Sequence, residues 1–397
     1  MSDTAPTSVV DQVLAAVSEL LPEIAASAAE RDRTRSLPRY VLDLLSSAGA
    51  FSVTVPTTHG GPGGGAAVAF EVTRLLATAD PNVAQIPQSH FVYLRLAELA
   101  GSASLLDELF GAVLTGERVA NAQSERTGRT VTDQTTRMRL VDGATVVDGR
   151  KFYCTGSLTA DWIAVLGRDE DDVEQVGFVR AGTSGLTIVD DWTGMGQRTT
   201  ASGTITFEGV RVDPSHVVPR QRAVTGPHGY GAFAQGLHAA IDVGIARGAL
   251  TEAAAFVRSS TRPWFEADVE RAEQDPLLVQ RFGELEVDVR AAESALVVAG
   301  AAVDAIASAP PSRVDDVARE ASLQVAAAKV LGDRAALAVT SALFELGSTR
   351  SSDDGLNLHR HWRNARTHTL HDPVRWKLQH LGRWSVAGTP PPRGPQF

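Results

Sequence analysis

Apolar residues recur at steps of three and four positions along the first part of the chain, which is the period of a helix with one buried face. The pattern is clearest over residues 9–24, where Val13, Val17 and Leu20 fall on one side. It returns over residues 38–48, 67–77, 89–99 and 103–114. Turn residues, including a glycine-rich run at 60–65, separate these segments. The first 118 residues are therefore predicted to form a helical unit.

The pattern changes between residues 119 and 228, where β-branched runs are broken by glycines. Strands are expected over residues 145–147, 162–166, 176–179, 186–189 and 203–212. In the last of these, Ile205 and Phe207 alternate with polar residues until Gly209 shifts the apolar positions to the other parity. That shift predicts a β-bulge, in a sheet that buries one face.

Long helical patterns return after residue 229. They cover residues 237–259, 276–307 and 314–346, with Gly347 as the expected C-cap, and a fourth helix is expected around Trp362 and Arg366. Four long helices with short connections predict a bundle. The expected fold class is α+β, with an N-terminal helical domain over 1–118, a central β-barrel or sandwich over 119–228 and a C-terminal four-helix bundle over 229–397.

The composition narrows the class of protein. The chain has 397 residues, of which 43% are apolar and 21% charged, as in soluble globular proteins. A net charge of −10 argues against nucleic acid or an anionic membrane as a partner. The single cysteine, Cys154, cannot form an internal disulfide, which favours a cytoplasmic location. The most apolar stretch lies between Glu293 and Asp304 and is too short to predict a membrane span.

Histidine is concentrated near the C-terminus. Five of the ten histidines fall in the last forty residues: His359, His361, His368, His371 and His380. His368 and His371 are three positions apart, so they face one side if helical, and Asp372-Pro373 is expected to end or kink that helix. A metal pair and a pair of proton donors both fit this spacing. Because no third ligand has supporting spacing, proton donors are favoured and no metal is expected.

Other catalytic motifs are missing from the sequence. The chain has no phosphate-loop ending, no dinucleotide fingerprint in a βαβ context and no Gly-x-Ser-x-Gly elbow. Any hydride that the protein uses is therefore expected to come from another protein.

The order of the three units resembles the acyl-CoA dehydrogenase superfamily of flavoproteins along nearly the whole chain. The segments that carry this resemblance are residues 121–125, 150–156 and 192–210. A narrower likeness is to the flavin-dependent monooxygenase branch, which includes dibenzothiophene monooxygenase and the dimethylsulfone-related enzymes. It rests on residues 261–264, 275–276, 361–368 and 370–373.

The resemblance implies a flavin site. It places around the isoalloxazine ring Asn121, Ser124, Phe152, Tyr153, Cys154 and Trp192. Ser202 and Arg262 would hold the phosphate, with Arg262 coming either from the same subunit or from a neighbour, and His90, His368 and His371 would face the reacting edge. The family usually has serine or threonine at the position of Cys154, so a thiol contact there is weaker than a hydroxyl bond.

The resulting expectation is a cytoplasmic, homotetrameric, two-component monooxygenase. A separate flavin reductase would supply reduced FMN, with FAD as the second option. Dioxygen would add to the flavin as a C4a-hydroperoxide and oxygenate a small apolar substrate at sulfur or nitrogen, sulfur being preferred. Phe91, Trp192 and Phe233 are the expected apolar walls that keep water away.

Two other functions stay open on the sequence. One is an acyl-CoA dehydrogenase that uses Asp372 as its base, although this aspartate is one methylene shorter than the usual glutamate and precedes a proline. The other is a catalytically silent assembly partner with a flavoprotein fold.

Overall fold

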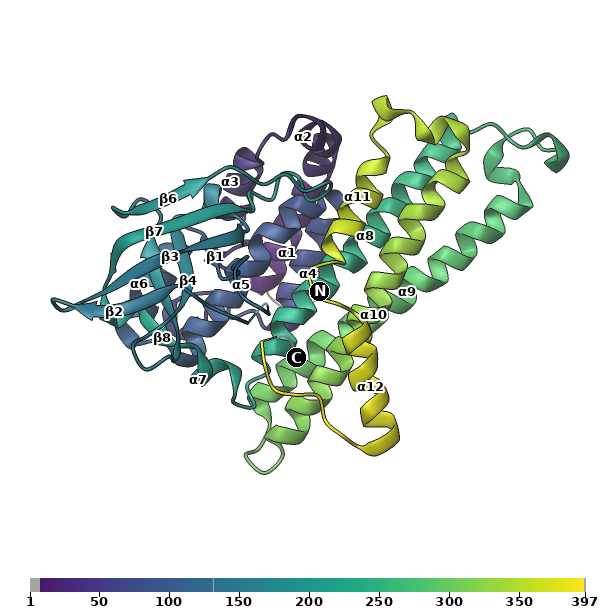
Figure 1. Cartoon of the computed structure of the whole chain (residues 1–397). Helices are drawn as coiled ribbons and strands as arrows, with labels where there is room; N and C mark the ends of the chain where they lie inside the picture. Colours follow the sequence, from purple (N-terminus) through teal and green to yellow (C-terminus); the bar gives the residue numbers. More distant parts are fainter. Residues whose placement is uncertain (1–7, 131, 396–397) are drawn as a thin grey trace, which may run out of the picture.

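The computed structural model describes residues 8–130 and 132–395. Figure 1 shows the sheet on one side of the molecule and the long helices of the C-terminal region on the other. Helices of the N-terminal region lie between them and contact both. This arrangement confirms the α+β class and the acyl-CoA dehydrogenase-like order of elements.

The N-terminal region is helical. Its helices are α1 (Val9–Ala26), α2 (Ala28–Thr34), α3 (Arg39–Ser47), α4 (Ala66–Ala79), α5 (Pro81–Ala100) and α6 (Ala103–Leu114). Helix α5 begins eight residues before the predicted start, because Asp80 caps it and Pro81 occupies its first position. Pro87 inside the helix obscured its first two turns in the sequence pattern.

The central region forms one eight-stranded sheet. Its strands are β1 (Val119–Ala122), β2 (Arg137–Val141), β3 (Ala144–Cys154), β4 (Trp162–Arg168), β5 (Glu174–Arg180), β6 (Leu186–Val189), β7 (Gly203–Val212) and β8 (Val217–Pro219). The order is β6-β7-β3-β2-β4-β5-β8, and β1 pairs with β4. The predicted bulge is confirmed: Val147 faces Val210 and Gly149 faces Phe207, so β7 carries one extra residue, and Gly209 has φ +64°.

The C-terminal region has three long helices and two short ones. They are α8 (Tyr230–Ser260), α9 (Pro276–Asp304), α10 (Val314–Gly347), α11 (His359–His368) and α12 (Arg375–Ala387), and a short helix, α7 (Arg220–Val224), precedes them. The prediction of a fourth long helix is wrong. Pro373 disfavours the helical conformation at Asp372, so the last segment divides into α11 and α12 on either side of it. The break places His371 and Asp372 in a turn between two helices.

Helix α9 with the turn after it, Pro276–Ser308, is long and apolar enough to cross a membrane by length and composition alone. It packs against α8, α10 and α4. Its two acidic residues near that stretch are both bonded: Glu293 to Arg247 of α8, and Asp304 to the first backbone N–H groups of α4. These contacts are those of a bundle helix.

Candidate active site

The connection from β6 to β7 joins the sheet to the helices. The backbone N–H of Gln197 donates to Asn364 Oδ1 of α11 (2.7 Å), and that of Thr199 donates to Asn82 Oδ1 of α5 (3.1 Å). Gln197 and Ala201 adopt left-handed backbone conformations, with φ of +50° and +51°. The connection is therefore tied to two helices at the junction of the sheet with the helical regions.

Several buried polar atoms on this connection, and on the strand and helices β1, α5 and α8, have no hydrogen-bond partner within the described part of the chain. They are Oδ1 of Asn121 on β1, Oε1 of Gln85 on α5, Oε1 of Gln235 on α8, both side-chain polar atoms of Gln197, and Oγ1 of Thr199. Orphaned buried polar groups are rare in folded proteins, because each costs about 1–3 kcal/mol. A neutral set of amides and a hydroxyl fits a flat ring edge of alternating N–H and C=O groups, as in isoalloxazine. The residues present therefore fit a flavin.

Sequence reasoning found one member of this set, Asn121. It missed the three glutamines and Thr199, because neutral amides carry no local signal of burial and their placement depends on tertiary packing.

The predicted aromatic residues lie together. The rings of Tyr153 and Trp192 meet edge to face at 6.0 Å, and Trp192 donates from Nε1 to the backbone oxygen of Gln197 (2.7 Å). The guanidinium of Arg126, which the sequence analysis did not single out, lies 4.6 Å from the Phe152 ring centre and 4.9 Å from that of Tyr153. Ser124 joins this group, because its backbone oxygen accepts from the Phe152 N–H at 2.9 Å.

Cys154 requires a correction. Its side chain is fully buried in the core of the sheet with Ile205, Val147 and Met138, and burial raises the pKa of its thiol to about 12. The register of β3 against β7 shifts between Lys151 and Cys154, which turns Tyr153 outward and Cys154 inward. The thiol packs as a core group of the sheet, which disfavours the predicted contact with the flavin.

The two predicted phosphate ligands differ in their surroundings. Ser202 is buried, and its Oγ lies 2.8 Å from Thr155 Oγ1 and 2.7 Å from Thr200 Oγ1, in a chain of hydroxyls. Arg262 is exposed on the connection between α8 and α9. Figure 1 shows that connection at the end of the bundle away from the sheet. The two residues are not brought together within one chain.

Three histidines meet in the helical region. His238 of α8 lies between His368 and His371: its Nδ1 is 3.1 Å from Nε2 of His368, and its ring stacks on that of His371 with centroids 3.7 Å apart. The sequence analysis predicted that His368 and His371 face one side if both are helical; α11 ends at His368, but both side chains contact His238. His238 itself was missed, because a lone histidine 130 residues earlier carries no signal of this contact.

His368 and His371 each contact an aspartate that is paired with a lysine. Asp242 lies between His368 and Lys329, with contacts of 2.6 and 2.5 Å. Burial alone would raise the pKa of Asp242, but Lys329 and His368 hold it below its usual value. Asp372 lies between His371 and Lys377, at 3.6 and 3.0 Å. Both aspartates are therefore carboxylates.

Lys329 and Lys377 belong to a small set. The chain has three lysines, and the third is Lys151 of β3. All three side chains are between 0 and 2% exposed, and each is paired with an acid.

His90 requires a second correction. The backbone N–H of Val119 donates to its Nδ1 (3.0 Å), and its Nε2 lies 2.9 Å from the backbone oxygen of Phe51. Burial lowers the pKa of His90 to about 4, so the ring is neutral. Both ring nitrogens are occupied by backbone groups, so His90 joins α5 to β1, and this disfavours the predicted role at the reacting edge.

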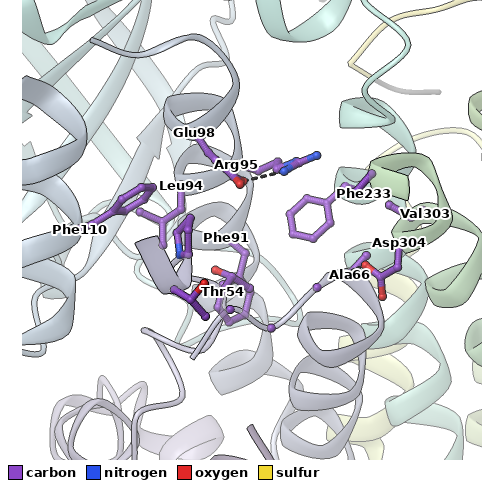
Figure 2. Close-up of a pocket in the computed structure, with 16 residues that line it drawn as sticks. Thr54, Ala66, Phe91, Leu94, Arg95, Glu98, Phe110, Phe233, Val303 and Asp304 are labelled. Atoms are coloured by element: carbon purple, nitrogen blue, oxygen red, sulfur yellow. Dashed lines mark hydrogen bonds and ion pairs between the residues drawn. The ribbon is translucent and has the colours of Figure 1, made fainter. Parts of the chain in front are cut away.

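A cavity of about 310 Å³ lies beside α5 (Figure 2). Phe91, Phe110 and Phe233 line it, and its rim carries the ion pair of Arg95 with Glu98. Two of the three predicted apolar walls, Phe91 and Phe233, thus share one cavity, whereas Trp192 lies with the aromatic group beside the sheet. None of the described residues that line the cavity is a histidine or a predicted cofactor ligand.

Two further predictions concern a metal site and Asp372 as the base of an acyl-CoA dehydrogenase. Within residues 8–130 and 132–395, no group of three or more His, Cys, Asp or Glu side chains has the geometry to hold a metal ion. Asp372, the base of the alternative hypothesis, is 4% exposed. Burial opposes its charge, but His371, Lys377 and Lys329 hold the pKa of Asp372 well below its usual range. A carboxylate held in this way is a weak base.

Comparisons with known proteins agree with this description. Family models described as the acyl-CoA dehydrogenase N-terminal and C-terminal domains match residues 10–117 and 236–376. The dibenzothiophene monooxygenase of Rhodococcus qingshengii is 30% identical over 379 residues, which cover 92% of this chain and 91% of that protein. The probable FMNH2-dependent monooxygenase SfnC of Pseudomonas putida is 28% identical and covers 94% of each chain. The crystal structure of FMN-bound TdsC from Paenibacillus sp. A11-2 superposes with a TM-score of 0.91 at 28% identity, over 97% of this chain and all of that one.

The chain belongs to the acyl-CoA dehydrogenase family, and the two relatives named above are monooxygenases, of which SfnC is described as FMNH2-dependent. The predictions of family, fold, FMN as cofactor and monooxygenase class are confirmed.

Proposed function

We propose that the protein oxygenates a small, largely apolar sulfur compound with reduced FMN and dioxygen. In the balanced reaction a thioether, dioxygen and FMNH2 give a sulfoxide, water and FMN. The observation that carries the proposal is the pairing of two features: a neutral orphaned polar set that fits a flavin edge, and a cluster of three imidazoles. The known activities of its relatives support the sulfur substrate over the nitrogen alternative.

The residues that would hold FMN are at the junction of sheet and helices. Asn121, Gln197 and Thr199 offer unpaired polar atoms to the ring, and Phe152 and Trp192 offer aromatic surface. Ser202 and, from a neighbouring subunit, Arg262 would hold the phosphate. Reduced FMN, when bound, supplies two electrons and activates dioxygen.

The chain's own residues would control protons and water. The side chain of His371 is 46% exposed and would face a bound ligand, whereas His368 and His238 are buried. Burial lowers the pKa of both buried imidazoles, so they are neutral and able to accept a proton. Trp192, packed against Tyr153 beside the proposed flavin residues, would help to exclude water from the site.

The proposed partners are a flavin reductase and further copies of the chain. FMNH2-dependent relatives imply a supply of reduced flavin, and we propose a separate flavin reductase, with FMN preferred to FAD. We also propose a homotetramer in the cytoplasm, in which Arg262 of one subunit serves the site of another.

The decisive experiment mixes anaerobic protein carrying reduced FMN with oxygenated buffer and records the flavin spectrum. The expected result is a long-lived absorbance that belongs to neither reduced nor oxidised flavin, and conversion of added dibenzothiophene to its sulfoxide. Direct return to oxidised flavin, with no oxygenated product from dibenzothiophene, would contradict the proposal.

The acyl-CoA dehydrogenase alternative makes the opposite prediction. It requires bleaching of bound oxidised flavin by an acyl-CoA without oxygen, and loss of bleaching in Asp372→Asn. The weak basicity of Asp372 favours no bleaching. The assembly-partner alternative predicts no turnover with any reductase.

A further inference from the structure

Two series of lysine, aspartate and histidine converge on His238. In the first, Lys329 of α10 pairs with Asp242 of α8, and Asp242 contacts Nδ1 of His368. In the second, Lys377 pairs with Asp372, and Asp372 faces Nδ1 of His371. His238 contacts the end of each series, by a hydrogen bond to His368 and by stacking on His371.

The first series fixes where the protons lie. Asp242 is ionised because Lys329 holds it, so it can only accept, and Nδ1 of His368 must carry the hydrogen. Neutral His368 then has a bare Nε2. The 3.1 Å contact with Nδ1 of His238 requires that His238 donates, which leaves Nε2 of neutral His238 without a hydrogen.

This arrangement is the reverse of the one at His90. There the Val119 N–H donates to Nδ1, so the hydrogen of His90 lies on Nε2 and is donated to the oxygen of Phe51. The chain thus contains neutral imidazoles of both tautomers, with the hydrogen on Nδ1 or on Nε2, and in each case the hydrogen-bond partner determines the tautomer.

We infer that His238 is a proton-relay residue of the active site and that Asp242, held by Lys329, is the positioning residue that sets its direction. A proton that reaches Nε2 of His238 moves the Nδ1 proton to Nε2 of His368. His368 becomes an imidazolium beside Asp242, and His238 returns to a neutral ring with its hydrogen on Nε2. Reversal of these two transfers returns the proton. No other bond changes.

The charges around the relay allow one extra proton. The groups that face it are Asp242 of α8, Lys329 and Asp333 of α10, the His371 and Asp372 turn, and Lys377 of α12. The two lysine–aspartate pairs cancel when the imidazoles are neutral. A second imidazolium, at His238, would meet the charge on His368 with the two ring centroids only 5.3 Å apart. The relay therefore stores a single proton.

The role in catalysis rests on the proposed function, but the positions of the protons do not. They can be measured on the protein without flavin, by solid-state ¹⁵N NMR of histidine-labelled protein. Glutamine variants of His90, His238 and His368 assign the signals. We expect hydrogen on Nδ1 of His238 and His368 and on Nε2 of His90. Hydrogen on Nε2 of either His238 or His368 would overturn the inference.

Asp242→Asn tests the positioning role. We expect an Nε2–H signal to appear at His368, and the rate of sulfoxide formation to fall by about 10²-fold, the lower end of what a positioned acid–base group contributes. FMN affinity should not change. Asp333→Asn is the matched control, since Asp333 is a buried carboxylate near the same groups but outside the hydrogen-bonded series. Equal effects of the two variants would mean a general field effect and would overturn the role of Asp242.

Asp242→Asn leaves Lys329 buried without a partner, which can prevent folding. The double variant Asp242→Asn with Lys329→Gln removes both charges and should give the same change in proton position. If the wild-type proton positions are as expected but dibenzothiophene gives no sulfoxide, the proposed function is contradicted and the assigned proton positions stand. If sulfoxide forms but the proton positions are reversed, only the relay fails.

Discussion

His238 and His371 stack with their ring centroids 3.7 Å apart, although they are 133 positions apart along the chain and only His371 reaches the surface. Stacked imidazoles at this distance cannot both be charged without strong repulsion. Burial lowers the pKa of His238, so in the resting protein its ring is neutral and packs flat against the exposed ring of His371.

Loss of His371 should uncouple oxygen consumption from oxygenation. We expect His371→Ala and His368→Ala to release more hydrogen peroxide for each sulfoxide formed, because a proton then reaches the reacting oxygen less reliably. Peroxide and product are measured in the same reaction. His228→Ala, an exposed histidine before α8, is the control and should behave as wild type. Unchanged coupling in both test variants would count against the proposed roles.

His90→Ala should weaken the fold without affecting flavin binding. The substitution leaves the Val119 N–H and the Phe51 oxygen buried without a partner, so we expect a loss of about 2 kcal/mol or more in the free energy of unfolding. Urea denaturation of the apoprotein and an FMN titration measure the two quantities. A large fall in FMN affinity with normal stability would restore His90 to the flavin site.

Cys154→Ala should bind FMN as the wild type does, because the thiol lies in the sheet core. Cys154→Ser should cost about 1–3 kcal/mol of stability, since it buries a hydroxyl among apolar side chains. Fluorescence quenching of FMN and thermal unfolding of both variants provide the test. If serine instead tightens FMN binding, the side chain faces the cofactor after all.

Asn121→Leu should reduce FMN affinity by roughly tenfold, the equivalent of one hydrogen bond. The apoprotein should be no less stable, because the orphaned Oδ1 is removed. Thr54→Val is the matched control. It also removes a buried unpaired oxygen, but at the aromatic cavity, and should leave FMN affinity unchanged.

Acid stability should depend on Glu125. Burial opposes its charge, but hydrogen bonds from Lys151 and Thr135 lower the pKa of Glu125 from 4.5 to about 2. A carboxyl with a lowered pKa in the folded state stabilises the fold above its unfolded pKa, and this contribution is lost as the pH falls through the folded value. The free energy of unfolding of Glu125→Gln should therefore fall less steeply between about pH 4.5 and 2 than that of wild type. Glu170→Gln, exposed after β4, should follow wild type.

The sequence correctly predicted those features whose conformation is decided by neighbouring residues. The parity change at Gly209 identified the bulge, and the spacing of His368 and His371 identified their common side. The stop at Pro373 was expected as well, although the prediction of a fourth long helix did not separate α12 from α11. In each case neighbouring residues decide the conformation.

The rest of the site depends on contacts between distant segments. Asp242 and Lys329 are 87 positions apart, and each on its own is typical of an exposed helix face. Only the packing of α8 against α10 makes them a buried pair. The predicted position of the Cys154 side chain differs from the structure for a related reason. Tyr153 has φ +58°, and the shifted register at that point reverses the side of the strand on which Cys154 lies.

The burial of all three lysines has a chemical consequence. Amine-directed reagents, such as succinimidyl esters or acyl donors, find no lysine side chain on the folded surface, where guanidinium groups carry the basic charge. Acylation of a lysine in this protein should therefore occur only after local opening of the strand or helix that carries it. The rate of acylation of Lys329, measured by mass spectrometry, would then report how often the helical bundle opens around its histidines.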